Sequence, residues 1–277
     1  MKPALSILVM CLMGCTGRAL GLPEDGGVWI KVPPGSFMAG SPSNEPCRFH
    51  SEKGSKITLT YGFEIQSTEV TQGQFLAVMG YNPSKFTSCG NDCPVERVNW
   101  GEAAAYCNAL SEKTGTTTCY DCTGTEAGTR CEDHNKNAPE IYQCFGYRLP
   151  TNAEWEYAYR AGTATAYYDG PSTPSACRCS PKDTNADKIG WYCANSQGPT
   201  TAGLKLPNSW GIFDMAGNVE EWCHDDPDPR PWGANRSVRG GSWHSFAWSL
   251  RAAAWERQSP EYRNPTVGFR CVKRISP

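Results

Sequence analysis

The sequence predicts a single α+β domain that is rich in loops, has little regular secondary structure and is stapled by disulfides. The 277-residue chain contains 28 glycines, 21 prolines and 10 tryptophans, which is typical of irregular segments with aromatic side chains wedged between them. It also contains 15 cysteines. Three segments carry helix signals, whereas short strand-like stretches recur along the chain. Few helices, many short strands and long connections together indicate an α+β domain.

Three helices are predicted because a capping residue is followed three positions later by Gln or Glu, and because a glycine follows each helix. The predicted helices cover residues 75–79, 103–113 and 155–161, after the pairs Thr71 and Gln74, Asn99 and Glu102, and Thr151 and Glu154. In the second helix, Cys107 shares one apolar face with Tyr106 and Leu110, so we expect a buried thiol or disulfide there rather than a nucleophile. Strands are expected at 28–32, at 57–60 continuing to 63–65, and at 267–272.

The N-terminus resembles an export signal. Lys2 precedes a short apolar run at 4–13, too short to span a membrane, and Leu12-Met13-Gly14-Cys15 resembles the bacterial lipobox. We therefore expect a signal peptide at 1–14, a lipidated Cys15, a linker at 15–25 and one domain at 26–277. An ordinary cleaved signal is the alternative. Export with a lipid anchor would place the protein at the bacterial cell envelope, in the outer membrane or periplasm.

The formal net charge of −2 gives no electrostatic basis for binding nucleic acid, so none is expected as a partner. Contact with a membrane is expected through the lipid anchor only. The four histidines are scattered, and no pair has a metal-ligand spacing.

The cysteine density of an exported chain favours disulfides. Without Cys11 and Cys15 thirteen cysteines remain, so at least one is free or pairs between chains. Residues 119–144 look like a Cys-rich insertion. Its Cys-x-x-Cys spacing and the nearby His134 would also suit a zinc site. No second Cys-x-x-Cys pair follows, so disulfides are favoured over zinc. The close pairs at 89/93 and 177/179 are expected to bridge outward rather than to each other.

Several motifs resemble the formylglycine-generating enzyme (sulfatase-modifying factor) family. The strongest are Pro-Asn-Ser-Trp-Gly-Ile-Phe-Asp-Met-Ala-Gly-Asn-Val-Glu-Glu-Trp at 207–222 and Arg-Gly-Gly-Ser-Trp at 239–243. Weaker matches run in the family's order, at 37–41, 69–72, 78–86, 94–100, 147–158 and 268–271. The resemblance implies the formylglycine-generating-enzyme variant of the C-type lectin fold.

The resemblance also implies an active site whose catalytic thiols this chain lacks. Family enzymes hold copper(I), a soft ion that prefers thiolates, on two cysteines that follow the Arg-Gly-Gly-Ser run. Here Ser245 and Ser249 stand at those places, while the neighbouring Ser242 is retained. Glu220 replaces a tryptophan that the family usually has near the same pocket. Copper is therefore not expected as a cofactor.

A structural calcium site is a second implication of the resemblance. Asp214, Gly217, Val219 and Glu221 match the family's ligands, two carboxylates and two backbone carbonyls, which is the hard oxygen set that calcium requires. The alternative is that Asp214 and Glu221 only cap turns.

The segment after the replaced thiols is a candidate recognition surface. Trp243, His244, Trp248 and Arg251 combine aromatic side chains with a cation, residue types that are enriched at recognition hot spots. We therefore expect a non-oxidase binding or scaffolding protein that takes a protein or peptide ligand on the former active-site face. The alternative is an oxidase that converts a client cysteine in a Cys-x-Pro-x-Arg motif to formylglycine.

Overall fold

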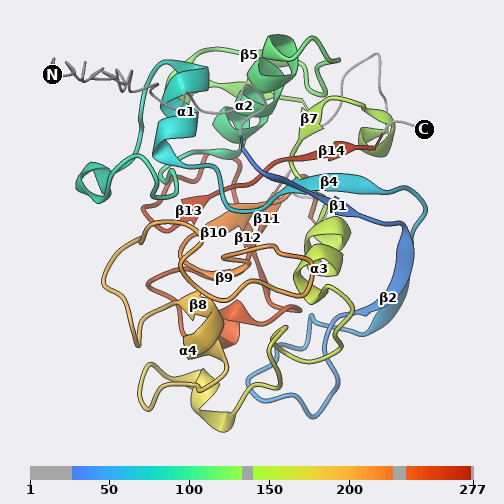
Figure 1. The fold of residues 1–277 in the computed structure, drawn as a ribbon, viewed down its shortest axis with the longest axis vertical. Helices are drawn as coiled ribbons and strands as arrows, with labels where there is room; N and C mark the ends of the chain where they lie inside the picture. The colour runs from blue at the N-terminus through green and yellow to red at the C-terminus, as the bar shows by residue number, and fades with distance from the viewer. Residues whose placement is uncertain (1–26, 133–139, 227–234, 276–277) are drawn as a thin grey trace, which may run out of the picture.

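The computed structural model describes residues 27–132, 140–226 and 235–275 (Figure 1). The expected signal peptide, Cys15, the linker 15–25 and His134 lie outside the described residues. Among the residues that are described, no helix is long and apolar enough to cross a membrane.

All three predicted capping boxes are present. In each, the side chain of the threonine or asparagine cap accepts a hydrogen bond from the backbone N–H three residues later, and the Gln or Glu side chain at that later position accepts one from the backbone N–H of the cap. Gly80 ends the first of these helices in the left-handed conformation, as predicted. The α-helices are α1 (Gln72–Met79), α2 (Trp100–Lys113), α3 (Asn152–Arg160) and α4 (Ala186–Ile189). Short 3-10 turns are η1 (Thr87–Cys89), η2 (Glu126–Gly128), η3 (Ile141–Gln143), η4 (Pro174–Cys177) and η5 (Ala247–Leu250).

Two four-stranded sheets form the framework. The first has the order β1 (Trp29–Val32), β4 (Phe63–Gln66), β14 (Val272–Arg274), β7 (Tyr147–Arg148). The second has the order β12 (Trp255–Gln258), β11 (Arg236–Arg239), β10 (Glu220–Trp222), β13 (Val267–Gly268). In Figure 1, α1 and α2 lie on one side of β1, β4 and β14, and α3 lies on the other.

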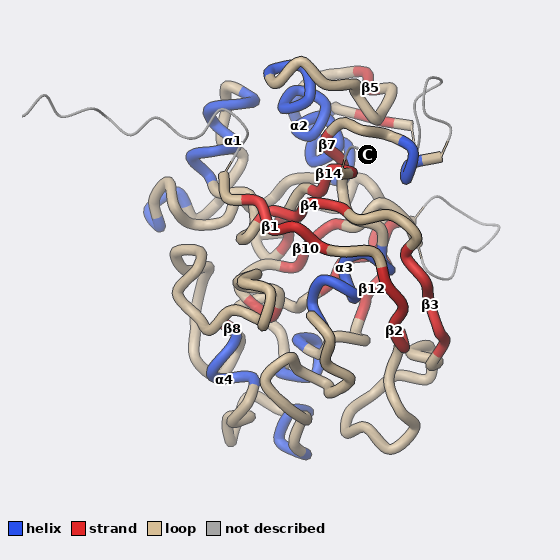
Figure 2. The backbone as a smooth tube through the Cα atoms, turned by 45° about the vertical axis from the view of Figure 1, so that its right-hand side comes forward, coloured by secondary structure: helices blue, strands red, loops and turns tan. Residues whose placement is uncertain are grey.

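Three two-stranded pairs complete the described strands. They are β2 (Gly35–Ala39) with β3 (Ser55–Leu59), β5 (Cys122–Thr123) with β6 (Arg130–Cys131), and β8 (Gly190–Trp191) with β9 (Ala216–Gly217). Figure 2 shows the β2–β3 hairpin as two long neighbouring strands beside α3. The loop-rich α+β architecture that the sequence predicts is confirmed.

The predicted last strand at 267–272 is wrong in one respect, because it is divided between the two sheets. β13 pairs in parallel with β10, whereas β14 pairs with β4 and β7. The chain crosses between the sheets at Phe269, Arg270 and Cys271, and all three are fully buried. Arg270 points inward and pairs with Glu221, so these residues connect the two sheets through the core.

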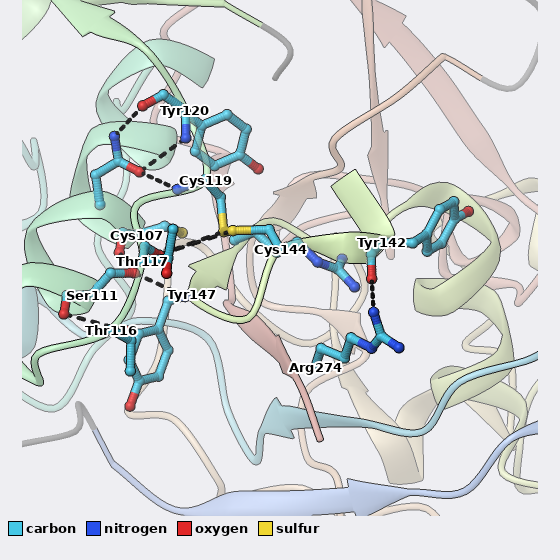
Figure 3. Close-up of a disulfide and its surroundings, with 12 residues drawn as sticks. Cys107, Ser111, Thr116, Thr117, Cys119, Tyr120, Tyr142, Cys144, Tyr147 and Arg274 are labelled. Carbon is cyan, nitrogen blue, oxygen red and sulfur yellow. Dashed lines mark hydrogen bonds between the residues drawn. A yellow bond between two sulfur atoms is a disulfide. The ribbon is translucent and has the colours of Figure 1, made fainter. Parts of the chain in front are cut away.

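Five disulfides link the described residues, which is typical of exported proteins. The two cysteines of the Cys-x-x-Cys pair belong to different bridges, Cys119–Cys144 and Cys122–Cys131, so they do not form a zinc site. Figure 3 shows the Cys119–Cys144 bridge beside α2, close to the buried Cys107.

The outward-bridging prediction is half right. Cys177 and Cys179 do bridge outward, to Cys47 and Cys193. Cys89 and Cys93 bond to each other instead, with their Cα atoms 5.9 Å apart. The chain reverses at Gly90, whose φ is 103°, and Cys93 N–H donates to the Gly90 carbonyl, so the turn brings the two sulfurs together.

Three cysteines of the described chain are free and buried, Cys107, Cys223 and Cys271. The predicted core position of Cys107 is confirmed, since it is fully buried in the cluster around α2. Its sulfur lies 3.1 Å from the sulfur of Cys271.

Candidate functional site

The loop that carries the predicted site residues begins where β11 ends. Gly240 and Gly241 both have positive φ, 88° and 65°. A Cβ on Gly240 would lie 3.0 Å from the Met215 carbonyl oxygen, and one on Gly241 would lie 2.9 Å from the Ser249 Cβ. Glycine is therefore required at both positions by backbone conformation and by close packing. The double glycine lets the chain turn so that Ser249 and Leu250 pack against Gly241.

The structure brings two of the three predicted serines together. Ser242 Oγ lies 3.0 Å from Ser245 Oγ, which also accepts from the Ser242 backbone N–H at 3.1 Å. Ser249 is buried in η5, where it packs against Gly241. These hydroxyls are hard, neutral groups, so they do not provide the soft ligand pair that copper(I) prefers.

His244 is not placed to act as a base for these hydroxyls. Its ring is exposed, and His244 reaches Ser242 only through its backbone N–H, at 3.4 Å. A hydroxyl needs an adjacent base within hydrogen-bond reach to act as a nucleophile.

The aromatic residues of the loop are partly open to solvent. The indole of Trp243 donates to the Pro265 carbonyl at 3.1 Å and packs edge-on against Phe86. Trp248 packs edge-on against Phe49, with ring centroids 4.6 Å apart. Phe49 and Phe246 are 43% and 45% exposed, so the loop presents a band of aromatic surface rather than isolated side chains.

Arg251 does not lie on this surface, contrary to the prediction that it contacts a ligand. Its side chain is fully buried and donates to Glu52 through both terminal nitrogens, each at 2.7 Å. It also donates to Glu45 at 2.7 Å and to the Cys47 carbonyl at 3.1 Å. Burial opposes the ionisation of Glu52, but the hydrogen bonds and charge of Arg251 outweigh it and lower the pKa of Glu52. Arg251 holds the 45–52 loop against η5.

The predicted calcium ligands converge only in part. Asp214 Oδ1 is buried without a partner, while Oδ2 accepts from the Gly203 N–H. Glu221 has no free oxygen, because Arg270 donates to both of its oxygens and the Trp155 indole donates to one. Among the described residues no group of three or more His, Cys, Asp or Glu side chains is arranged to hold a metal. Gly217 and Val219 are expected to contribute only backbone carbonyls, so calcium at these four residues stays a prediction, with Asp214 Oδ1 unpartnered and both Glu221 oxygens bonded to Arg270.

A feature that sequence reasoning missed lies beside this acidic group. Both carboxylate oxygens of Glu69 are fully buried without a partner. Burial and the neighbouring Asp214 charge raise the pKa of Glu69 well above its usual value. Burial likewise raises the pKa of Asp214, to about 6. In the sequence, Glu69 lies two residues before the first helix cap and within the family-like match at 69–72, which does not indicate burial.

A narrow pocket lies between the second sheet and η5. Glu220 lines it, together with Trp248, Ser249, Trp255 and Glu256. Burial, with a further contribution from the nearby Glu256 carboxylate, raises the pKa of Glu220 to about 8, while a hydrogen bond with Ser245 opposes the rise. Glu220 was a candidate from the sequence, whereas Glu256 was not, because only strand pairing places Glu256 in the same pocket.

Comparisons with known proteins agree with this geometry. Residues 23–275 match the sulfatase-modifying factor enzyme 1-like domain. A relative named chaperone protein LppX, from Paenibacillus barcinonensis, is 36% identical over 250 residues, which cover 80% of this chain and 84% of that protein. The formylglycine-generating enzyme of Streptomyces coelicolor is 34% identical over 148 residues, 46% of this chain and 46% of that enzyme.

A solved structure, Treponema denticola variable protein 1, superposes with a TM-score of 0.71 at 28% identity and covers 89% of this chain and 95% of its own. The family model spans most of the chain, and the loop-rich α+β fold agrees with it. The chain therefore belongs to the sulfatase-modifying factor enzyme 1-like, or formylglycine-generating enzyme, family.

Proposed function

We propose that this protein is an exported, non-oxidase member of its family that binds a polypeptide partner on its former active-site face. The observation that carries the proposal is the Ser242–Ser245 hydroxyl pair at 3.0 Å in a loop whose family counterpart carries copper thiols. The exposed aromatic band beside it supplies the residue types that dominate recognition energy. The relative whose printed name is chaperone protein LppX matches over most of its length, whereas the formylglycine-generating enzyme cited above matches over 46%.

The three free cysteines do not favour the oxidase alternative. Cys107, Cys223 and Cys271 are fully buried. Burial raises the pKa of both Cys223 and Cys271 well above the usual thiol value. A thiolate is the form that binds metal and reacts, so these cysteines are poor substitutes for the missing pair.

The cellular location that we propose is the bacterial envelope, with a lipid on Cys15. The five disulfides support an oxidising compartment. Labelling cells with radioactive palmitate tests the anchor, and a Cys15→Ser variant serves as the control. Label on the variant, or no label on the natural protein, would exclude lipidation at this residue.

Calcium at Asp214 remains a prediction. A chelator is expected to lower the melting temperature if Glu221 releases Arg270 to complete the site. An unchanged melting curve would argue for the arginine-paired arrangement alone.

Two assays test the proposed function together. The chain, loaded with copper(I), is incubated in air with a Cys-x-Pro-x-Arg peptide; we expect no mass change by mass spectrometry. In the second assay, binding to reduced, carboxymethylated lactalbumin is expected to weaken at least about tenfold in Trp248→Ala and Phe246→Ala. Tyr61→Ala, which removes an exposed aromatic ring from the β3–β4 turn, is the matched control. Formylglycine formation, or equal binding by all variants, would overturn the proposal.

A further inference from the structure

Strand register places the two glutamates of the narrow pocket on one face of the second sheet. Trp222 of β10, Val238 of β11 and Glu256 of β12 lie opposite one another. Side chains two apart on one strand share a face of a sheet, so Glu220 lies on the same face as Trp222 and Glu256. Val238, Gly240, Gly241 and Ala254 line the pocket together with the two glutamates.

Two tryptophans are among the residues that line the pocket. They are Trp248 of η5 and Trp255 of β12, and Ser249 also lines it. The inner volume of about 10 Å³ is close to the minimum that holds one water-sized group. A primary ammonium has that size, whereas a planar guanidinium is broader and needs a fork of acceptors.

The charge of the pocket is not balanced from within the part of the chain that the structure describes. Glu220 is only 9% exposed, and its side-chain partner is the Ser245 hydroxyl rather than a cation. Glu256 has no Lys or Arg partner among the described side chains, and the neighbouring Arg257 pairs with Asp226 instead. Burying two carboxyl groups close together costs free energy when no cation pairs with them, and a bound cation would offset that cost.

We propose that this pocket binds the ammonium group of a lysine side chain on the partner polypeptide. This assignment rests on the proposed function and names the residue type that the former active-site face selects. The carboxyl groups supply ion-paired hydrogen bonds, and the indole faces of Trp248 and Trp255 supply cation–π attraction, which is strongest for tryptophan. The lysine stem would lie along the apolar walls while its charged end reaches Glu220 and Glu256.

A neighbouring cavity favours a polypeptide over a free amine as the source of the ammonium. Trp255 also lines a cavity of about 530 Å³ bounded by the β2–β3 hairpin, the start of α3 and β12. Cavities of this size accommodate ligands much larger than a single alkylamine. A peptide that places its lysine in the narrow pocket therefore has room for adjoining residues on the other side of Trp255.

Synthetic peptides test the lysine assignment directly. The probes are an N-acetylated, C-amidated nonapeptide of Ser and Val with one central Lys, and its acetyl-lysine, Arg and norleucine versions. Binding to the full chain is followed by fluorescence anisotropy at fixed ionic strength. We expect the Lys peptide to bind at least about tenfold more tightly than the other three, which corresponds to about 1.4 kcal/mol. n-Butylamine, compared with N-butylacetamide, shows whether the ammonium binds without a peptide.

Variants locate the effect. Glu256→Gln and Glu220→Gln are expected to abolish the preference for Lys over acetyl-lysine, whereas Glu261→Gln, an exposed carboxyl outside the pocket, is expected to keep it. Melting curves show which variants are folded. If all four peptides bind equally well, the lysine assignment fails while the proposed function stands. If denatured lactalbumin and all peptides fail to bind, both fail. If butylamine binds and the Lys peptide shows no preference, the pocket takes free amines and the polypeptide assignment is wrong.

Discussion

Replacing Arg251 with methionine is expected to destabilise the fold strongly while leaving the aromatic surface of η5 in place. The Arg251 side chain is fully buried and makes four hydrogen bonds to Glu45, Glu52 and the Cys47 carbonyl. Without the guanidinium, the Glu52 carboxylate, 2% exposed, keeps only Ser41 Oγ and the Phe49 N–H as donors.

The size of the effect follows from this uncompensated charge. Removing one partner of a buried ion pair costs about 3–5 kcal/mol. For a domain of about 250 residues, 1 kcal/mol shifts the melting temperature by about 2–4 °C, so a decrease of about 6–20 °C is expected. The double variant Arg251→Met/Glu52→Met removes both charges and is expected to recover at least half of the loss, because an apolar pair of similar volume no longer leaves a buried charge.

Urea unfolding and differential scanning calorimetry, with disulfides kept oxidised, measure the effect. Lys188→Met is the matched control, since its pair with Asp169 is about half exposed and is expected to contribute less than about 1 kcal/mol. A loss below about 1 kcal/mol in Arg251→Met, or a double variant less stable than the single one, would refute the reasoning. In that case Arg251 would be available for the ligand contact that its sequence position suggested.

Three further outcomes are expected. Gly146→Ala would place a Cβ 1.7 Å from the Thr117 carbonyl oxygen, so a loss of about 3 kcal/mol or more is expected in urea unfolding, and wild-type stability would contradict this packing. Replacing both cysteines of the bridge in Figure 3 by serine opens a link across 25 residues and should cost about 3–4 kcal/mol by calorimetry; no change would show that the bridge does not constrain the unfolded chain. Burial opposes ionisation of Glu154, but the charge and hydrogen bonds of Arg148 outweigh it and lower the pKa of Glu154. The ion pair therefore stabilises the folded state fully above pH 4.5, and this stabilisation is lost as the pH falls through the lowered pKa. The urea midpoint should therefore drop on acidification, and less steeply in Glu154→Gln.

Local features were predictable because their causes lie within a few residues of sequence. A helix cap such as Thr151 with Glu154 needs only a side chain and an N–H three positions away, and all three predicted caps are present. The family and the α+β class could likewise be recognised from motifs. The closed turn that joins Cys89 to Cys93 was missed because it depends on the backbone conformation of a single glycine.

Contacts between distant segments were decided by the tertiary structure alone. Arg251 meets Glu52 across 199 positions, and Arg270 meets Glu221 across 49, so the sequence could not show that both arginines are buried in ion pairs. Glu256 lies on the same face as Glu220 because β11 pairs with both of their strands. The sequence by itself determined the family, the fold class and the helix starts, because these depend on residue identity and near neighbours. Which charged groups are neutralised, and which face an open pocket, depends on strand order and packing.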